Sequence, residues 1–377
     1  MISATKPEMG PYDAYIDEIR DIWDTGIMTH NGPKVQKFRE KLIERIGCKN
    51  AELFVNGHSA SMIALKALEL PAGGEVLTSP FTFVSTTNAI VQNNLTPVFC
   101  DIDSTYNIDI ESIKRNITDK TCAIFVPHIF GIPCHVQEIE EITKKHGLKV
   151  IYDAAQAFGT RIDGTDIGCF GDITMFSFHA IKVFNSIEGG LLTFKDERLK
   201  EKFELYRNFG ICYGETNDVG VAGYNAKMNE FQAAMGLVNI RLVDKVIEKR
   251  KELAELYINL IAEIPGVETY HYEKNIAYNF AYFPVIINAD VYGKTRDELW
   301  NALKAAGIGT RKLYDTLTCD FSVFRSSNYR KDTAFAEKVT EKCLDLPMYS
   351  SMRPKDVEMI GNKLMQIKKR LKMNYIF

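Results

Sequence analysis

The sequence has no long hydrophobic run and no basic segment followed by an apolar one at its start. Its longest apolar stretch, from Cys122 to Cys134, is interrupted by Pro127, His128 and Pro133. A membrane-spanning helix needs about 20 apolar residues, and a secretion signal places an apolar segment behind a basic start. We therefore expect no membrane association and no export.

The sequence also lacks an excess of charge of one sign and any pair of closely spaced cysteines. Its 46 basic and 49 acidic residues leave a net charge of −3, which disfavours nucleic acid as a partner. The eight cysteines are scattered, which predicts free thiols in the cytoplasm. The spacing of Cys122, His128, Cys134 and His135 matches no zinc-ligand pattern, so we expect no metal.

What the sequence does contain is a repeated alternation of short apolar runs and helix-like segments. The predicted strands are Val76–Thr78, Pro97–Asp101, Ala123–Pro127, Lys149–Tyr152, Ile173–Phe178 and Gly190–Phe194, and the predicted helices include Ser59–Leu70, Ser85–Asn93 and Val136–His146. This pattern is typical of an α/β protein with a mostly parallel central sheet. One long helix is predicted from Asn229 to about Ile264, and a smaller α/β region follows it.

The length of 377 residues favours two domains. We place them at residues 1–245 and 246–377, with the boundary inside the predicted long helix. In doubly wound sheets, ligands bind beyond the carboxyl ends of the strands. The residues that follow each predicted strand are therefore the candidates for chemistry.

Asp153 and Lys182 are the strongest of these candidates. Asp153 ends an apolar strand, where a buried carboxylate needs a partner, such as a protonated pyridine nitrogen. The alternative is that Asp153 caps a helix. Lys182 has apolar neighbours, among them Phe178 and Phe184. Desolvation favours a neutral amine, which can form a Schiff base, although a lysine can also extend to the surface.

Weaker signals come from the segment Asn56-Gly57-His58-Ser59 and from Phe83. The segment precedes a predicted helix, and backbone N–H groups at a helix start bind phosphate. Helix capping alone produces the same pattern. Phe83 follows a strand and could stack on a flat ring, or it could belong to the core.

These residues match a known family when they are taken in order. The segment Phe176–Gly190, with Lys182 at its centre, resembles the cofactor-lysine segment of the DegT/DnrJ/StrS sugar aminotransferases. The match extends over nearly the whole chain. It includes Gly32-Pro33, Asn56-Gly57, Thr82–Ser85, Val126–Pro133, Tyr152–Gln156, Gly223–Glu230, Thr310–Tyr314 and Leu346–Tyr349. Many ordered matches are more specific than any single one.

The resemblance implies the aspartate-aminotransferase fold (fold type I), a pyridoxal 5'-phosphate (PLP) cofactor and a homodimer with shared active sites. Lys182 would be the catalytic residue and would hold PLP as an imine. The other implied cofactor contacts are Gly57, His58, Ser59, Phe83, Asp153, Gln156, Ser177 and, from the neighbouring subunit, Asn225. The implied substrate contacts are Asn31, His179, Arg311 and Tyr314. Arg311 could equally be a structural ion pair.

The implied reaction moves the amino group of L-glutamate to a keto sugar carried on a nucleotide, with pyridoxamine 5'-phosphate as the second cofactor form. The string around Lys182 is most similar to enzymes that make dTDP-4-amino-4,6-dideoxyglucose from the 4-keto-6-deoxy sugar, for bacterial surface polysaccharide. The alternatives are amination at carbon 3, a PLP-dependent sugar dehydratase and a regulatory PLP-binding protein. Relatives often carry Thr or Ser where this chain has His58. A phosphate contact there is therefore expected through the backbone N–H.

Overall fold

The computed structural model describes residues 1–212 and 218–373, with side chains as far as Lys368. Its centre is a seven-stranded sheet with the strand order β1-β9-β8-β5-β4-β2-β3. The strands are β1 (Asn50–Phe54), β2 (Glu75–Thr78), β3 (Thr96–Phe99), β4 (Thr121–Pro127), β5 (Lys149–Asp153), β8 (Ile173–Ser177) and β9 (Gly190–Phe194). The pairs within β3-β2-β4-β5-β8 are parallel, and β9 runs antiparallel to both neighbours. The predicted α/β fold with a mostly parallel sheet is confirmed.

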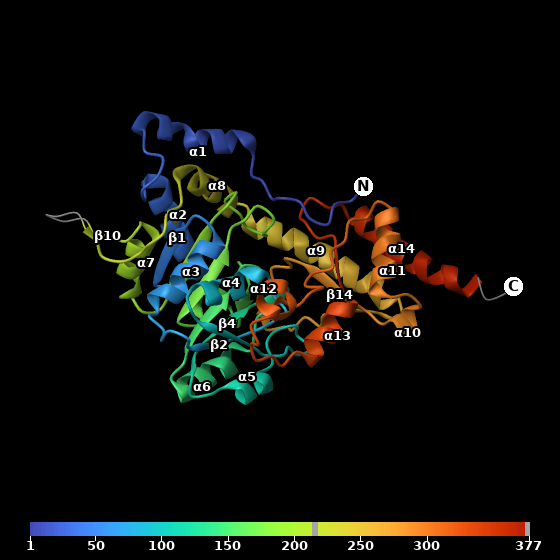
Figure 1. Ribbon diagram of the computed structural model, residues 1–377. Coiled ribbons are helices and arrows are strands. Elements are labelled where there is room, and N and C mark those ends of the chain that lie inside the picture. Colours follow the sequence, from blue (N-terminus) through green and yellow to red (C-terminus); the bar gives the residue numbers. More distant parts are fainter. Residues whose placement is uncertain (213–217, 374–377) are drawn as a thin grey trace.

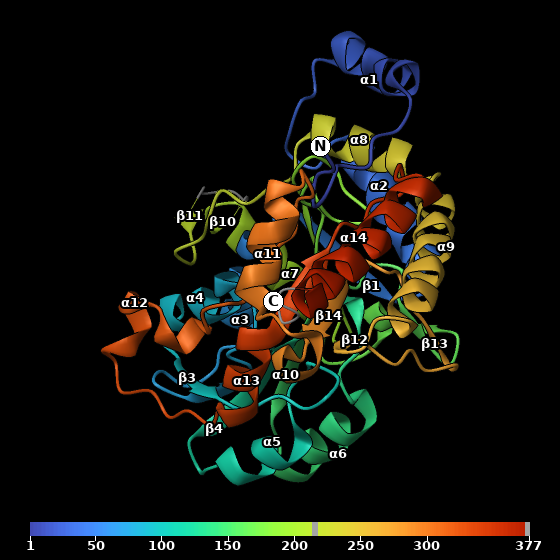
Figure 2. The ribbon, with the colours of Figure 1, turned by 90° about the vertical axis from the view of Figure 1, so that its right-hand side faces the viewer.

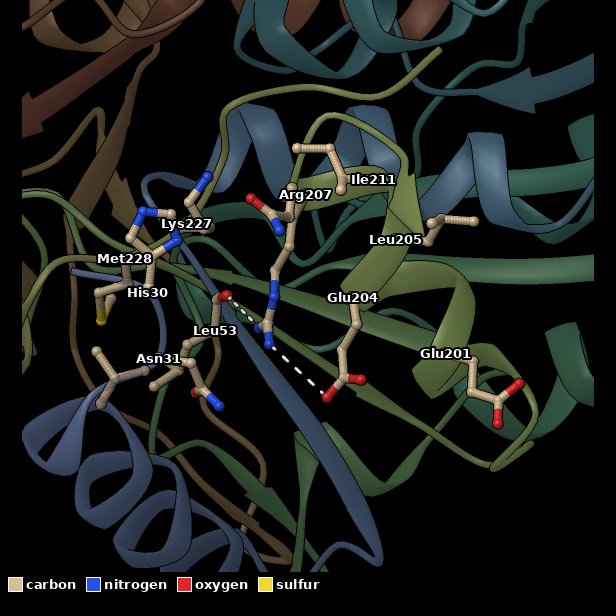
Figure 3. A pocket seen from close by; sticks show the side chains of 12 residues that line it. His30, Asn31, Leu53, Glu201, Glu204, Leu205, Arg207, Ile211, Lys227 and Met228 are labelled. Carbon is tan, nitrogen blue, oxygen red and sulfur yellow. Dashed lines mark hydrogen bonds and ion pairs between the residues drawn. The ribbon is translucent and has the colours of Figure 1, made fainter. Parts of the chain in front are cut away.

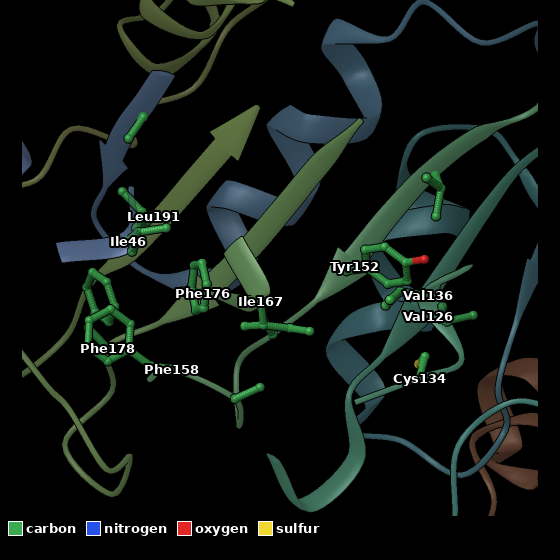
Figure 4. Packing of buried hydrophobic residues seen from close by; sticks show 14 of the residues in the cluster. Ile46, Val126, Cys134, Val136, Tyr152, Phe158, Ile167, Phe176, Phe178 and Leu191 are labelled. Carbon is green, nitrogen blue, oxygen red and sulfur yellow. The ribbon is translucent and has the colours of Figure 1, made fainter. Parts of the chain in front are cut away.

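Alternate residues of each strand pack on opposite faces of this sheet, because successive side chains of a strand point to opposite sides. One face carries Val126 and Phe176 under α2 (Pro33–Ile46), α6 (Val136–His146) and α8 (Glu230–Ile240), and Figure 4 shows part of this core. The other carries Phe125 and Met175 under α3 (Gly57–Ala67), α4 (Val84–Gln92) and α7 (Leu199–Arg207). By the same alternation, Asp153 and Ser177 belong to the face that α3 and α4 cover.

A second core lies in the C-terminal part of the chain, to the right in Figure 1. Its antiparallel sheet has the order β12 (Val267–Thr269), β14 (Phe283–Ile287), β15 (Cys343–Leu346). Around it lie α10 (Ala289–Tyr292), α11 (Arg296–Ala305), α13 (Ala334–Lys342) and α14 (Pro354–Met373). Ile2 also joins this core, and its N–H donates to the Gly307 carbonyl at 2.8 Å. The domain boundary at residue 245 stays a prediction.

The predicted long helix is in fact two helices, α8 and α9 (Val243–Ala262), separated at Arg241 and Leu242. No glycine or proline marks the break, so the helical pattern did not reveal it. α8 is buried on most sides against α1 (Tyr12–Thr25) and α2. α9 instead runs toward the second core, as Figures 1 and 2 show. Because α8 and α9 pack against different parts of the protein, the helix breaks where its propensity alone would continue it.

The remaining elements are short. They are α5 (Ile110–Asn116), β6 (Arg161–Ile162), β7 (Thr165–Asp166), β10 (Ile211–Cys212), β11 (Asp218–Val219), β13 (Ile276–Ala277), α12 (Ser322–Arg325) and the 3-10 turns η1 (Ile129–Gly131), η2 (Ile167–Cys169) and η3 (Thr318–Asp320). α1 projects from the body at the top of Figures 1 and 2. Within the described ranges, no helix is both long and apolar enough to cross a membrane.

Candidate active site

Lys182 lies on the loop that connects β8 to its antiparallel neighbour β9. Its N–H donates to the His179 carbonyl at 2.9 Å, which closes a turn. The next residues anchor the loop, because Val183 and Phe184 are buried and the Phe184 ring stacks on Phe158 with centroids 4.5 Å apart. Lys182 itself is half-buried and lines a narrow cleft together with Gln156 and Tyr282. It is therefore not a lysine that extends freely into solvent.

Asp153 ends β5 and is 7% exposed. One carboxylate oxygen accepts from the Thr86 hydroxyl at 2.9 Å, and the other accepts from the Ala155 N–H at 3.0 Å. Burial raises the pKa of Asp153, whereas these two hydrogen bonds and the positive charge of Lys182 lower it. The segment after Asp153 forms turns and no helix, so Asp153 does not cap a helix. It is a buried carboxylate whose pKa the charge of Lys182 lowers.

Gln156 lies at the junction of the two parts of the chain. Its side-chain oxygen accepts from the Phe130 N–H at 2.7 Å, and its amide nitrogen donates to the Tyr314 hydroxyl. Because the amide nitrogen carries two hydrogens, one of them stays available for a ligand. Phe130 and Tyr314 both have a φ of 59°, which bulky residues rarely adopt. Backbone strain of this kind gathers at functional sites.

The start of α3 forms a compact cradle against the end of β8. A Cβ atom on Gly57 would lie 2.8 Å from Ser177 Cβ, and a Cβ atom on Gly190 would lie 2.4 Å from the Asn56 carbonyl oxygen. Only glycine fits at either position. The first N–H groups of a helix have no partner inside the helix, so those of Gly57 and His58 are free to meet an anion beside Ser177. This geometry fits the phosphate of the expected cofactor.

Two residues of the same segment have other partners. The Ser59 N–H donates to the Asn56 side chain at 2.8 Å, so any contact of Ser59 with phosphate needs its hydroxyl. His58 Nδ1 lies 2.8 Å from the Ser85 hydroxyl oxygen. Burial lowers the pKa of His58, and contact with Gln92 opposes that shift. The ring is therefore neutral at pH 7, which leaves the backbone N–H of His58 as its expected phosphate donor.

Phe83 is not a core residue, because 65% of it is exposed. It precedes α4 and stands one turn before Thr86, whose N–H donates to the Phe83 carbonyl at 3.2 Å. The sequence reasoning missed Ser85 and Thr86, which contact His58 and Asp153. Their spacing from Phe83 within one helical turn is the signal that could have found them.

The predicted substrate contacts Arg311 and His179 both have partners within the chain. Arg311 binds Asp345 through Nε at 3.0 Å and through Nη2 at 2.6 Å, and it lies over the Tyr282 ring. The alternative of a structural ion pair is therefore present in the structure. His179 Nε2 lies 3.4 Å from Glu188. A substrate contact of Arg311 would use Nη1, the guanidinium nitrogen that does not bind Asp345.

Asn31 and Asn225 belong to a different region. Asn31 lines an open hollow of about 760 Å³, shown in Figure 3, whose lining shares no residue with the Lys182 cleft. The Asn225 side chain is exposed and accepts from Lys227 at 2.9 Å, and Lys227 also lines this hollow. The side-chain oxygen of Asn31 is buried and has no hydrogen-bond partner among the described residues.

Across the described ranges, no group of three or more His, Cys, Asp or Glu side chains is placed to hold a metal ion. His128 is buried and accepts from the Cys134 N–H at 2.9 Å. Cys134 donates its thiol to the Pro127 carbonyl. These contacts explain why a histidine and a cysteine occur here.

Comparisons with known proteins agree with the family resemblance of the sequence. The sequence profile of the DegT/DnrJ/EryC1/StrS aminotransferase family matches residues 12–365. The dTDP-4-amino-4,6-dideoxy-D-glucose transaminase of Shigella dysenteriae is 36% identical over 368 residues, which cover 97% of this chain and 99% of that protein. The Escherichia coli enzyme of the same name is 36% identical over 372 residues, with coverages of 97% and 98%. A crystal structure of DesI with its TDP-sugar product has a TM-score of 0.91 at 28% identity and covers 98% of this chain and 93% of its own.

Proposed function

The chain belongs to the DegT/DnrJ/EryC1/StrS aminotransferase family and has its fold, and from this we propose that it uses PLP to move the amino group of L-glutamate to a nucleotide-linked keto-deoxy sugar. The observation that carries the proposal is the buried Asp153 carboxylate at the end of β5, together with the half-buried Lys182 on the loop after β8. Next to this pair stands the Gly57–Ser177 cradle, which suits a phosphate. A carboxylate, an amine and a phosphate cradle form the donor set that PLP requires.

Each residue then has a defined task in the proposed reaction. When bound, PLP supplies a protonated pyridine ring that withdraws electrons from the reacting carbon. Asp153 would accept the ring N–H, and Lys182 would hold the cofactor covalently. The Lys182 amine, when free, would carry the proton to and from the substrate as general base and acid. Gln156 would donate its free amide hydrogen to the ring hydroxyl, and Phe83 would stack on the ring.

For the acceptor we propose dTDP-4-keto-6-deoxyglucose, aminated at carbon 4 for a bacterial surface polysaccharide. Two relatives at 36% identity that carry out this kind of reaction support the choice. Amination at carbon 3 is the alternative. The cytoplasm is the proposed compartment, and each of the eight cysteines carries a free thiol, which agrees with it.

We further propose a homodimer in which Asn31 and Asn225 complete the site of the neighbouring subunit. Support comes from the separate hollow that Asn31 lines and from the buried, unpartnered Asn31 oxygen. The projecting α1 region also exposes apolar side chains, including Tyr12 at 76%, Trp23 at 71% and Met28 at 60%. Large exposed apolar groups along α1 and just after it favour an interaction surface in this region.

The experiment supplies purified protein with PLP and L-glutamate and measures 2-oxoglutarate. dTDP-4-keto-6-deoxyglucose is then added, and the aminated carbon is identified by NMR. We expect one 2-oxoglutarate per site before the sugar is added, continued turnover afterwards, and nitrogen at carbon 4. Nitrogen at carbon 3 would move the proposal to the alternative sugar. No 2-oxoglutarate from the wild-type protein would refute the proposed function.

A further inference from the structure

The first turn of α4 touches the candidate site at three points. Phe83 stands at its start and is exposed. Ser85 contacts His58 Nδ1 at 2.8 Å, and Thr86 donates to Asp153 at 2.9 Å. These residues share the first turn of one helix. This turn links the expected ring-stacking residue, the cradle and the buried carboxylate.

Asp153 depends on few donors. An ionised carboxylate offers about four lone-pair sites, and two of them are used, by the Ala155 N–H and the Thr86 hydroxyl. In the described part of the chain, no Lys, Arg or His nitrogen forms an ion pair with Asp153. The titratable groups whose charges interact with that of Asp153 are Lys182, Tyr314 and Cys134. Among the residues that the structure describes, Thr86 is the one whose side chain donates a hydrogen bond to this carboxylate.

The direction of that hydrogen bond follows from chemistry. An ionised carboxylate can only accept, so Thr86 donates its hydroxyl hydrogen. The Thr86 oxygen is then free to accept from the Thr82 hydroxyl, which lies 3.3 Å away. Thr82 is 3% exposed and Thr86 is 0% exposed. In a dry setting, chained hydrogen bonds strengthen one another, so the pair favours the charged form of Asp153.

We infer that Thr86 is a positioning residue of this aminotransferase, which fixes the Asp153 carboxylate in place and in its charged form toward the ring nitrogen of PLP. The inference rests on the proposed function. Thr86 is fully buried and does not line the Lys182 cleft, so its expected effect on the cofactor passes through the hydrogen bond to Asp153. The Thr86→Val variant keeps the shape of the side chain and removes the donor, whereas Thr86→Ser keeps the hydroxyl.

The adjacent Thr87 provides a matched control. It lies on the same helix, is also 0% exposed, and donates to the Thr318 hydroxyl at 3.1 Å instead of to Asp153. Thr87→Val therefore removes one buried hydroxyl hydrogen bond from α4 without touching the carboxylate. Any general cost of a buried Thr→Val change appears in both variants. Only an effect through Asp153 separates them.

The first measurement is the PLP affinity of each purified full-length protein, by absorbance titration. A hydrogen bond to a charged group is worth about 1.5–3 kcal/mol, so we expect Thr86→Val to bind PLP roughly 10- to 100-fold more weakly. Thr86→Ser and Thr87→Val should stay within about threefold of wild type. If Thr86→Val fails to fold, Thr86→Ala removes the same donor with less strain. Equal affinities of the Val variants at positions 86 and 87 would overturn the inference.

The second measurement uses the cofactor-free protein, so it does not depend on the proposed function. The carboxyl carbon of Asp153 is followed by NMR across a pH titration, with its signal assigned by loss in Asp153→Asn. We expect a higher pKa of Asp153 in Thr86→Val and an unchanged one in Thr87→Val. An unchanged pKa in Thr86→Val would refute the role of Thr86. A wild-type protein that binds no PLP would instead refute the proposed function.

Discussion

Two buried aspartates in this chain have very different hydrogen-bond partners. Asp153 ends β5 and is 7% exposed, and Asp345 lies in β15 and is 0% exposed. Burial raises the pKa of both carboxyls. Asp345 receives two guanidinium nitrogens of Arg311 and the Phe283 N–H. From the described residues, Asp153 receives only the Thr86 hydroxyl and the Ala155 N–H.

The difference separates structure from function. Asp345 is neutralised by a cation that the chain supplies, so its burial is already compensated. Asp153 bears the cost of burial without an ion pair among the described residues. It ends β5, next to β8, whose last residue Ser177 packs against the start of α3. Such a carboxylate is a functional-site candidate, because its missing partner can be a ligand. A buried charge is therefore informative only together with its partners.

Asp345→Asn is expected to give the largest loss of stability. An asparagine can accept on only one side, so either Arg311 or the Phe283 N–H loses its partner. Breaking a buried ion pair on one side costs about 3 kcal/mol. Urea unfolding of the cofactor-free protein measures this loss. A cost below about 1 kcal/mol would show that the Arg311–Asp345 ion pair contributes little to stability. Asp345 would then not differ from Asp153 in the way described above.

Asp153→Asn is expected to damage activity instead of stability. Loss of a preorganised charge at the reacting group lowers kcat by about 10²- to 10³-fold. The variant should unfold at the same or a higher urea concentration than wild type at pH 7, because a costly buried charge is removed. A folded variant with wild-type kcat would contradict the assignment of Asp153 to the cofactor.

The pH dependence of stability tests the cost of burying the Asp153 charge. The pKa of Asp153 is raised above 3.8 in the folded protein, so the folded state keeps its proton to a higher pH than the unfolded chain does. Stability therefore falls as pH rises from 3.8 through the folded pKa, and the cost persists at neutral pH. The stability advantage of Asp153→Asn over wild type should grow from pH 4 to pH 7. A constant difference would contradict the burial cost.

Arg311→Lys tests how far the Asp345 pair depends on geometry. Lysine keeps the charge and loses the forked donors that reach one carboxylate oxygen from Nε and Nη2. We expect a loss of about 1 kcal/mol in the free energy of unfolding. A larger rise in the KM for the sugar than this stability change explains would support the predicted substrate contact of Arg311.

His135 and Asp103 form a third and more exposed pair. Breaking this pair should change the free energy of unfolding least. His135 Nε2 lies 2.7 Å from Asp103, with side-chain exposures of 35% and 25%. The hydrogen bond to Asp103 raises the pKa of His135. This stabilisation is present below pH 6.5 and is lost as pH rises through the folded pKa. His135→Asn should cost about 0.5 kcal/mol at pH 5.5 and nothing at pH 8.5. Equal costs at both pH values would indicate a packing role.

The sequence predicted those parts of the fold that local patterns determine. The helix Val136–His146 and the strand Gly190–Phe194 have the predicted bounds. The break between α8 and α9 was missed, because it results from tertiary packing and no glycine or proline marks it. Asp153 and Lys182 were singled out because they follow predicted strands, whereas Gln156 came from the family resemblance, and the site roles of all three stay predictions. Ser85 and Thr86 were not found, because their roles depend on contacts across the fold.

The most direct test of the account is to locate the cofactor on the chain. Wild-type protein is incubated with PLP, reduced with borohydride, digested, and analysed by mass spectrometry, with Lys182→Ala treated in parallel. The account predicts a phosphopyridoxyl group on Lys182 in the wild-type protein and no stoichiometric label in the variant. A stoichiometric label on another lysine, or an equal label in Lys182→Ala, would contradict it.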